Sequence, residues 1–310
     1  MSGTRVANIA GTLHEAAADA AWIQWQALGA QAAAPRSPSS IVDPEALVLF
    51  SLWLADDEPR VHDFLTGFAE VGSRVLSVQR LKRAMRLFPA DADARVACFA
   101  ARIESLGKDP RWRKLAKPAP LGPGRPGKVG PPSTRMGEPG SLMLRLRTAF
   151  GVDVRSDTLT YLIGRREAWV DVKDIAEALL YAKYSVRLAC EALADARLVT
   201  SGTHRPVTYC ADHARWTALL DLRDTPSWHP WVTVFAFVLR LQQWLREGGL
   251  DTTSGTLAAS LAREFMLQHG TVLRQLPLDV PDLRDHLGEA YLPVFERTMV
   301  SFVRWLGENV

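Results

Sequence analysis

The sequence predicts a mainly α-helical fold in which one helix-turn-helix unit is followed by a short β-hairpin. Apolar residues recur at spacings of three and four over much of the 310-residue chain, as on the buried faces of helices. Two short β runs are confined to residues 198–210. A segment rich in Pro and Gly, residues 107–140, interrupts the helical patterns. We therefore predict helical N- and C-terminal domains on either side of a central domain that carries the hairpin.

The first predicted domain, residues 1–106, is helical, and its helices could include a second unit similar to a helix-turn-helix. An alanine-rich run at 12–34 predicts the first helix. Asp43 can cap the next helix, in which Pro44 takes the first position. Three more helices are expected, near 60–70, 78–88 and 91–105.

A basic helix is predicted at 78–88, where no acidic residue occurs between Val71 and Ala90. Its buried stripe consists of Val78, Leu81, Met85 and Phe88, which leaves most of the charges on the opposite side. This pattern suggests a second phosphate-binding helix, although a solvated helix face is the plainer alternative. The candidate contacts are Arg80, Lys82, Arg83 and Arg86.

Residues 107–140 are predicted to be a basic linker, because Pro and Gly are too frequent for helix or strand to propagate. Residues 108–140 contain 8 basic and 2 acidic residues, a net charge of +6. That charge suits a polyanionic partner or a solubilising spacer. The "GPGRPGK" of residues 122–128 matches the glycine spacing of phosphate-binding loops, but such loops need a preceding strand and a following helix. Nearby prolines also remove backbone amides, so no nucleotide site is predicted.

Two closely spaced helices are predicted in "DIAEALLYAKYSVRLACEALADARLV". Asp171 can cap a first helix at 172–180, and the second helix covers 184–196. Leu198 and Val199 then begin a strand, and "LVTSGTHRPVTYC" predicts two β runs joined by a turn at 202–206. The apolar positions with the spacing of buried faces are Ile175, Ala176 and Leu179 on the first helix, and Val186, Ala189, Cys190 and Leu193 on the second.

This string and the basic-tipped hairpin after it resemble the winged helix-turn-helix of bacterial MarR-like and ArsR-like transcriptional regulators. The resemblance covers residues 142–214 and implies a winged-helix domain at 141–222, whose second helix enters the DNA major groove. Two positions depart from the family pattern. Leu180 and Arg197 stand where such motifs often carry Gly.

The resemblance also implies which residues contact double-stranded DNA. Lys183 and Arg187 would reach phosphate or guanine, and Tyr184 and Ser185 would donate to phosphate. His204 and Arg205, at the tip of the hairpin, would reach the adjacent minor groove or backbone. Leu188 and Glu191 share this face of the helix. The alternative is a protein-binding module in which Tyr184 and Leu188 are the contact points.

Other chemistries find little support in the sequence. His204, Cys210 and His213 cluster within ten residues but lack a CxxC pair, so we predict no metal site. No catalytic constellation stands out, and we expect neither enzymatic activity nor a cofactor. Three cysteines at unrelated spacings indicate no disulfide framework, and the longest apolar runs, such as 231–239, are too short to span a bilayer. A cytoplasmic location without membrane association is therefore expected.

The last predicted domain, residues 223–310, is helical and acidic, with 8 basic and 11 acidic residues at 221–310. We predict that it serves dimerisation or partner binding, and that the protein is a homodimer. Packing within the chain is the alternative role for its amphipathic stripe, which consists of Leu292, Phe295, Met299, Phe302 and Trp305.

Together these patterns predict a DNA-binding transcriptional regulator that contacts double-stranded DNA through its winged helix. The alternative is a protein-interaction module such as an antitoxin, which neutralises a partner protein and autoregulates its operon.

Overall fold

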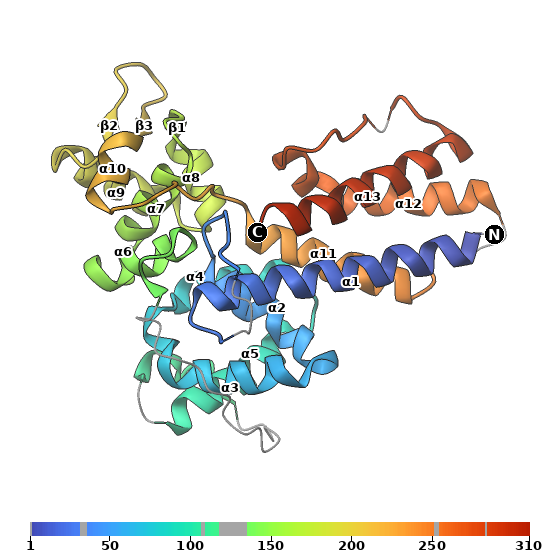
Figure 1. The fold of residues 1–310 in the computed structure, drawn as a ribbon. Coiled ribbons are helices and arrows are strands. Elements are labelled where there is room, and N and C mark those ends of the chain that lie inside the picture. The colour runs from blue at the N-terminus through green and yellow to red at the C-terminus, as the bar shows by residue number, and fades with distance from the viewer. Residues whose placement is uncertain (1, 32–35, 107–108, 118–134, 251–253, 283) are drawn as a thin grey trace. The chain divides into compact units, whose positions relative to one another are not determined.

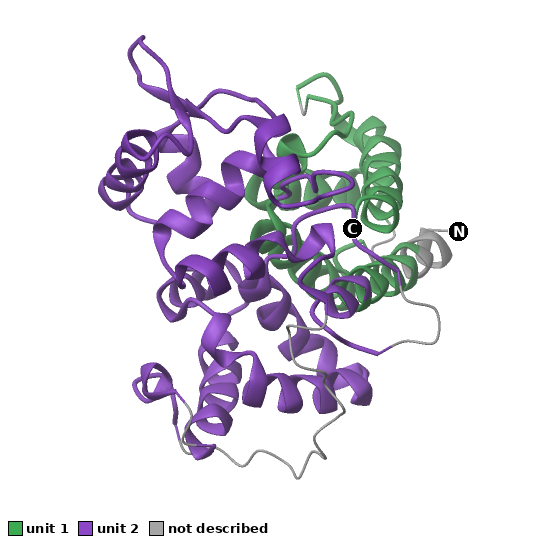
Figure 2. Ribbon diagram, turned by 60° about the vertical axis from the view of Figure 1, so that its left-hand side comes forward, with its two compact units in different colours: residues 1–22, 230–310 green, residues 23–229 purple. Residues whose placement is uncertain are grey.

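The structure, a computed structural model, is mainly helical with a small antiparallel sheet of three strands (Figure 1), which confirms the predicted fold class at that level. It describes residues 2–31, 36–106, 109–117, 135–250, 254–282 and 284–310, with the backbone alone for residues 2–8. The chain divides into two compact units, residues 23–229 and residues 1–22 with 230–310 (Figure 2). The predicted N-terminal and central domains therefore lie largely in one unit.

The first half of the larger unit is a group of short helices that follows the end of α1 (Ser2–Ala27). Asp43 caps the second helix by accepting from the Ala46 amide at 3.1 Å, with Pro44 at the first position, as predicted. The indole of Trp25 packs against Phe64 and Phe68. The elements are α2 (Pro44–Asp57), α3 (Pro59–Val71), η1 (Ser73–Val75), α4 (Val78–Ala84), η2 (Met85–Leu87) and α5 (Ala92–Ser105).

The beginning of the predicted linker is part of the folded structure. Residues 110–112 form the 3₁₀ turn η3 (Pro110–Trp112), and the Trp112 side chain is fully buried, 5.6 Å from Phe99 between ring centroids. Burial of so large an aromatic ring stabilises backbone that the Pro and Gly content predicted to be irregular. Residues 107–108 and 118–134, including "GPGRPGK" at 122–128, lie outside the described residues.

The second half of the larger unit contains the predicted helix pair and the hairpin. The first strand, which precedes the pair, was not predicted; it lies beside the third strand, with Val170 opposite Tyr209. The second strand pairs with the other edge of the third, with Thr200 opposite Cys210. The elements are η5 (Pro139–Ser141), α6 (Leu142–Phe150), α7 (Val154–Gly164), β1 (Val170–Asp171), α8 (Val172–Leu179), α9 (Lys183–Asp195), β2 (Thr200–Ser201), β3 (Thr208–Cys210) and α10 (His213–Leu219).

The smaller unit buries the apolar stripe that the sequence offered as a dimer surface. Phe295, Met299, Phe302 and Trp305 are almost completely buried, and Leu292 is partly buried. Helix α11 supplies aromatic neighbours within this unit: Phe237 meets Phe302 edge to face at 5.3 Å. The stripe therefore packs within the chain, which corrects its assignment to dimerisation. The elements are α11 (Trp231–Arg246), α12 (Gly255–His269), η6 (Gly270–Gln275), η7 (Gly288–Ala290) and α13 (Tyr291–Glu308).

Within the described part of the chain, no helix combines the length and the apolar character that crossing a membrane requires.

Candidate nucleic-acid interface

Helix α9 separates a buried face from an exposed one. Its buried residues are Val186, Ala189, Cys190 and Leu193, the four that the sequence predicted. Burial, with Glu191 nearby, raises the pKa of the Cys190 thiol to about 12, so this cysteine stays protonated and serves the core. The exposed face carries Lys183, Tyr184, Arg187, Leu188 and Glu191, whereas Ser185 is partly buried.

Tyr184 and Arg187 lie together on this exposed face. The Tyr184 side chain is 64% exposed, and the Arg187 guanidinium lies 5.3 Å from the centre of its ring. Arg187 Nε is also 3.8 Å from a Glu191 carboxylate oxygen, a solvent-exposed ion pair that contributes little to folding. The face thus presents a cation, an aromatic ring and a hydroxyl that the fold does not require.

Leu180 and Arg197, the two positions at which the resemblance led us to expect Gly, both have a left-handed backbone. Asp171 caps α8 by accepting from the Asp174 amide at 2.9 Å, as predicted. Leu180 ends α8 in the left-handed region at φ 58°, and Arg197 takes the same conformation, at φ 56°, just beyond α9. A left-handed conformation costs a non-glycine residue about 1–2 kcal/mol. Both residues thus adopt a backbone conformation that glycine takes more readily, although neither is Gly.

The hairpin places its basic tip in solvent. Residues 203–207 are exposed, including His204 and Arg205. The strands approach closely at Gly202, whose amide donates to the Thr208 carbonyl at 2.7 Å, and a Cβ there would lie 2.7 Å from Thr208 Oγ1. Trp169, beside this pair of strands, is 53% exposed. The hairpin therefore offers both charge and an aromatic surface.

Helix α4 packs against the C-terminal end of α8. The partly buried side chain of Arg83 donates at 2.7 Å to the carbonyl of Leu180, three residues before α9 begins. Lys82 on α4 and Arg86 in η2, which follows it, are both exposed. Two of the predicted basic residues are thus exposed, and a third, Arg83, connects α4 to the segment between α8 and α9.

Arg80 is a correction to the predicted interface, because its side chain is completely buried. Its guanidinium pairs with both oxygens of Asp43 and donates to Glu45 Oε2 at 2.6 Å. Arg80 Nε donates to the Leu179 carbonyl at 3.0 Å, at the end of α8. A guanidinium buried among carboxylates cannot reach DNA, so Arg80 connects α2 and α4 to α8 instead.

Arg147, on α6, is the second buried guanidinium. Its Nε and Nη2 donate to Asp157 at 2.7 and 2.8 Å, and its Nη1 donates to Glu45 Oε1 at 2.6 Å. The Tyr181 hydroxyl, in the turn before α9, donates to Asp157 Oδ2 at 2.8 Å. The buried ion network, as we name this set, consists of Asp43, Glu45, Arg80, Arg147, Asp157 and Tyr181.

The two guanidinium groups of the network lie among three carboxylates. Burial alone would raise the pKa of Asp157, but Arg147, with help from Arg80 and the Tyr181 hydroxyl, outweighs burial and lowers it. Burial, together with Asp157, raises the pKa of Tyr181, which therefore remains a neutral donor. Removing one partner from such a network leaves a buried charge without compensation, which typically costs about 3–5 kcal/mol. The network fixes the turn that precedes α9.

Sequence reasoning missed this network, although two signals were present. Arg147 falls at helical spacing from Met143 and Leu144, so it shares their buried face. Asp157 lies in α7, where the neighbouring residues are buried on all sides. A charged residue at a core position requires a buried partner, and that requirement could have suggested the pairing.

The three residues weighed as metal ligands do not form a site. His204 lies at the exposed hairpin tip, Cys210 is buried at the end of β3, and His213 begins α10. Burial raises the pKa of the Cys210 thiol, which disfavours the thiolate that a metal needs. Within the ranges that the structure describes, no group of three His, Cys, Asp or Glu side chains could hold a metal ion.

Comparison of the chain with protein-family models, with curated proteins and with solved structures finds no match.

Proposed function

We propose that this protein is a DNA-binding transcriptional regulator with a winged helix at residues 142–214. The observation that carries the proposal is the exposed face of α9, where Lys183, Tyr184 and Arg187 project from a helix whose opposite face is buried. The order of elements supports it, because a hairpin with a basic tip follows the helix pair directly.

Each exposed group has a role in the proposed complex. The N-terminal half of α9 enters the major groove, where Arg187 pairs with a guanine edge and Lys183 with phosphate or guanine. Tyr184 and Ser185 donate to phosphate, and His204 and Arg205 contact the neighbouring minor groove or backbone. Lys82 on α4 and Arg86 in η2 add phosphate contacts without sequence preference.

The proposal predicts two distinguishable effects on DNA affinity. Fluorescence anisotropy with duplexes selected from genomic fragments gives the dissociation constants. Arg187→Ala is expected to cost about 1–3 kcal/mol and to relax preference at one base position. Arg205→Ala is expected to weaken binding to all duplexes alike and to reduce the salt dependence by about one phosphate contact. Arg304→Ala, an exposed change on α13, is the control. Unchanged binding in both wing and helix variants would reject this interface.

The proposed regulator acts as a homodimer, because one recognition helix touches too few bases to define a site. Two half-sites about one helical turn apart would then be read together. Light scattering of the complex tests this point. A single chain bound per operator contradicts the dimer and leaves a reader of one site.

A protein-interaction module, such as an antitoxin, is the second candidate. Exposed apolar side chains on α9 and beside the hairpin favour it: Trp169 is 53%, Tyr184 64% and Leu188 45% exposed. Large exposed apolar groups are typical of protein-binding surfaces. Absence of duplex binding at low salt would favour this candidate, whereas affinity that falls steeply with salt supports DNA.

A further inference from the structure

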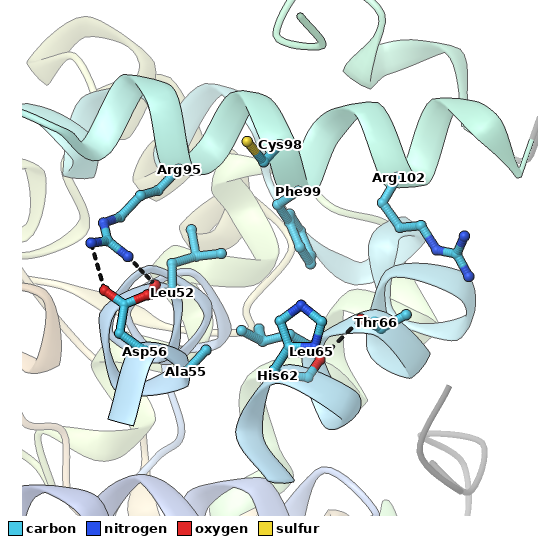
Figure 3. Close-up of a pocket in the computed structure, with 10 residues that line it drawn as sticks. All are labelled: Leu52, Ala55, Asp56, His62, Leu65, Thr66, Arg95, Cys98, Phe99 and Arg102. Atoms are coloured by element: carbon cyan, nitrogen blue, oxygen red, sulfur yellow. Dashed lines mark hydrogen bonds and ion pairs between the residues drawn. The ribbon is translucent and has the colours of Figure 1, made fainter. Parts of the chain in front are cut away.

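A pocket of about 200 Å³ lies between α2, α3 and α5 in the larger unit (Figure 3). The proposed DNA interface contributes no residue to it. Apolar side chains form most of its wall, among them Leu52, Leu65 and Phe99. Figure 3 shows His62 pointing from α3 toward Phe99 on α5. The polar residues of the wall are Asp56, His62, Thr66, Arg95 and Arg102.

One of the two arginines in the wall already has its partners. Arg95 donates to Asp56 at 2.7 Å and to Asp91 at 2.6 Å, and its Nη1 donates to the Leu52 carbonyl. Its guanidinium also lies over the Trp53 ring, 5.0 Å from the centroid. Two carboxylates therefore occupy the Arg95 guanidinium, which leaves it little to offer a ligand.

The other arginine lacks such partners. Arg102 forms no ion pair with any described residue, and its Nε is buried without a hydrogen-bond partner among them. A buried donor in this state favours an acceptor that enters the pocket. Its guanidinium presents donors in a planar fork that matches the two oxygens of a carboxylate.

We propose that this pocket binds a small apolar monocarboxylate, with Arg102 as its counter-ion. A cavity of about 150 Å³ lined by apolar side chains accommodates benzene. A pocket of about 200 Å³ therefore accepts an apolar body of roughly six carbon atoms together with a carboxylate. Asp56 in the wall disfavours an anion with two charges, because like charges repel at short range. The proposal stands independently of DNA binding.

Isothermal titration calorimetry with hexanoate and its neutral counterpart hexanamide tests the site in the full-length protein. Hexanoate is expected to bind with one site per chain, and hexanamide about tenfold or more weakly, because only the carboxylate makes charge-assisted hydrogen bonds. Arg102→Met keeps the apolar stem of the side chain. We expect it to weaken hexanoate by about tenfold or more and to leave hexanamide unchanged.

Two further variants keep the test decisive. Arg60→Met removes an exposed arginine on α3 that does not line the pocket and is expected to leave hexanoate binding unchanged. Cys98→Phe places a ring in the pocket and is expected to abolish binding of both probes, with circular dichroism reporting that the variant is folded. Equal affinity for the two probes overturns the proposal. Hexanoate binding that survives both Arg102→Met and Cys98→Phe also overturns it. The proposal fails as well if the parent protein does not bind hexanoate at millimolar concentration.

Discussion

Replacing Arg80 by Met removes a buried charge while nearly preserving side-chain volume. Arg80 donates to Asp43, to Glu45 and to the Leu179 carbonyl, and none of these acceptors can turn to water. In Arg80→Met, Arg147 still partners Glu45, but Asp43 loses its guanidinium. Because breaking a buried ion pair leaves an uncompensated charge, we expect a loss of about 3–5 kcal/mol in the free energy of unfolding.

Urea denaturation followed by circular dichroism measures this loss. Arg86→Met, an exposed change in the segment that follows α4, is the matched control and is expected to stay within about 0.5 kcal/mol of the parent. Arg80→Lys keeps the charge but loses the paired geometry, so an intermediate loss is expected. If the free energies of unfolding of Arg80→Met and Arg86→Met are equal, the network does not contribute to stability as argued. We also expect Arg80→Met to lower DNA affinity at temperatures where the protein stays folded. The reason is that the Leu179 carbonyl, at the end of α8, loses its hydrogen bond from Arg80.

Three other changes probe the backbone, the pH dependence and the core. Arg197→Gly, at an exposed position with φ 56°, is expected to raise the free energy of unfolding by about 1 kcal/mol, measured by urea denaturation; a loss would refute the strain. Burial, with Arg166 nearby, lowers the pKa of His229 to about 4. The neutral His229 side chain therefore makes its full contribution to the free energy of unfolding above the unfolded pKa of 6.5, and this contribution is lost as pH falls through about 4. This loss, at most about 3 kcal/mol, is expected to be absent from pH-dependent melts of His229→Gln. In the smaller unit, Met299→Ala is expected to lower the free energy of unfolding by about 2–5 kcal/mol, because Met299 is buried. Val300→Ala, at a side chain that is 52% exposed, is expected to lower it by less than about 0.5 kcal/mol, and thermal melts compare the two variants.

Local patterns allowed the helix pair and hairpin to be predicted from the sequence. Apolar spacing identified the buried faces of α8 and α9, and the short side chain of Asp171 identified where α8 begins. The resemblance to a winged helix implied that Lys183 and Arg187 face outward, and both are exposed. These features depend on neighbours three or four residues apart, which a sequence displays directly.

Arg80 and the domain boundaries depend on distant residues and could not be predicted in the same way. Four charges in "RLKRAMR" are alike as residue types, yet one is fully buried and two are exposed. The difference arises because Asp43 and Glu45 lie beside Arg80 in space but about 35 residues away in the chain. The same long-range pairs, with Arg147, place residues on both sides of the predicted linker in one unit.

Helix α2 takes part in two of these features at once. Glu45 belongs to the buried ion network, and Leu52 lies in the pocket wall, about 10 Å further along a rigid helix at 1.5 Å per residue. Because the helix is rigid, a ligand that shifts α2 at Leu52 also shifts the Glu45 carboxylate, which lies between Arg80 and Arg147. Thermodynamic reciprocity then applies: the factor by which the ligand shifts the equilibrium between arrangements of the network equals the factor by which that shift changes ligand affinity. The coupling free energy between the two ends of α2 can therefore be measured from either end, as a change in ligand affinity or as a change in stability on binding.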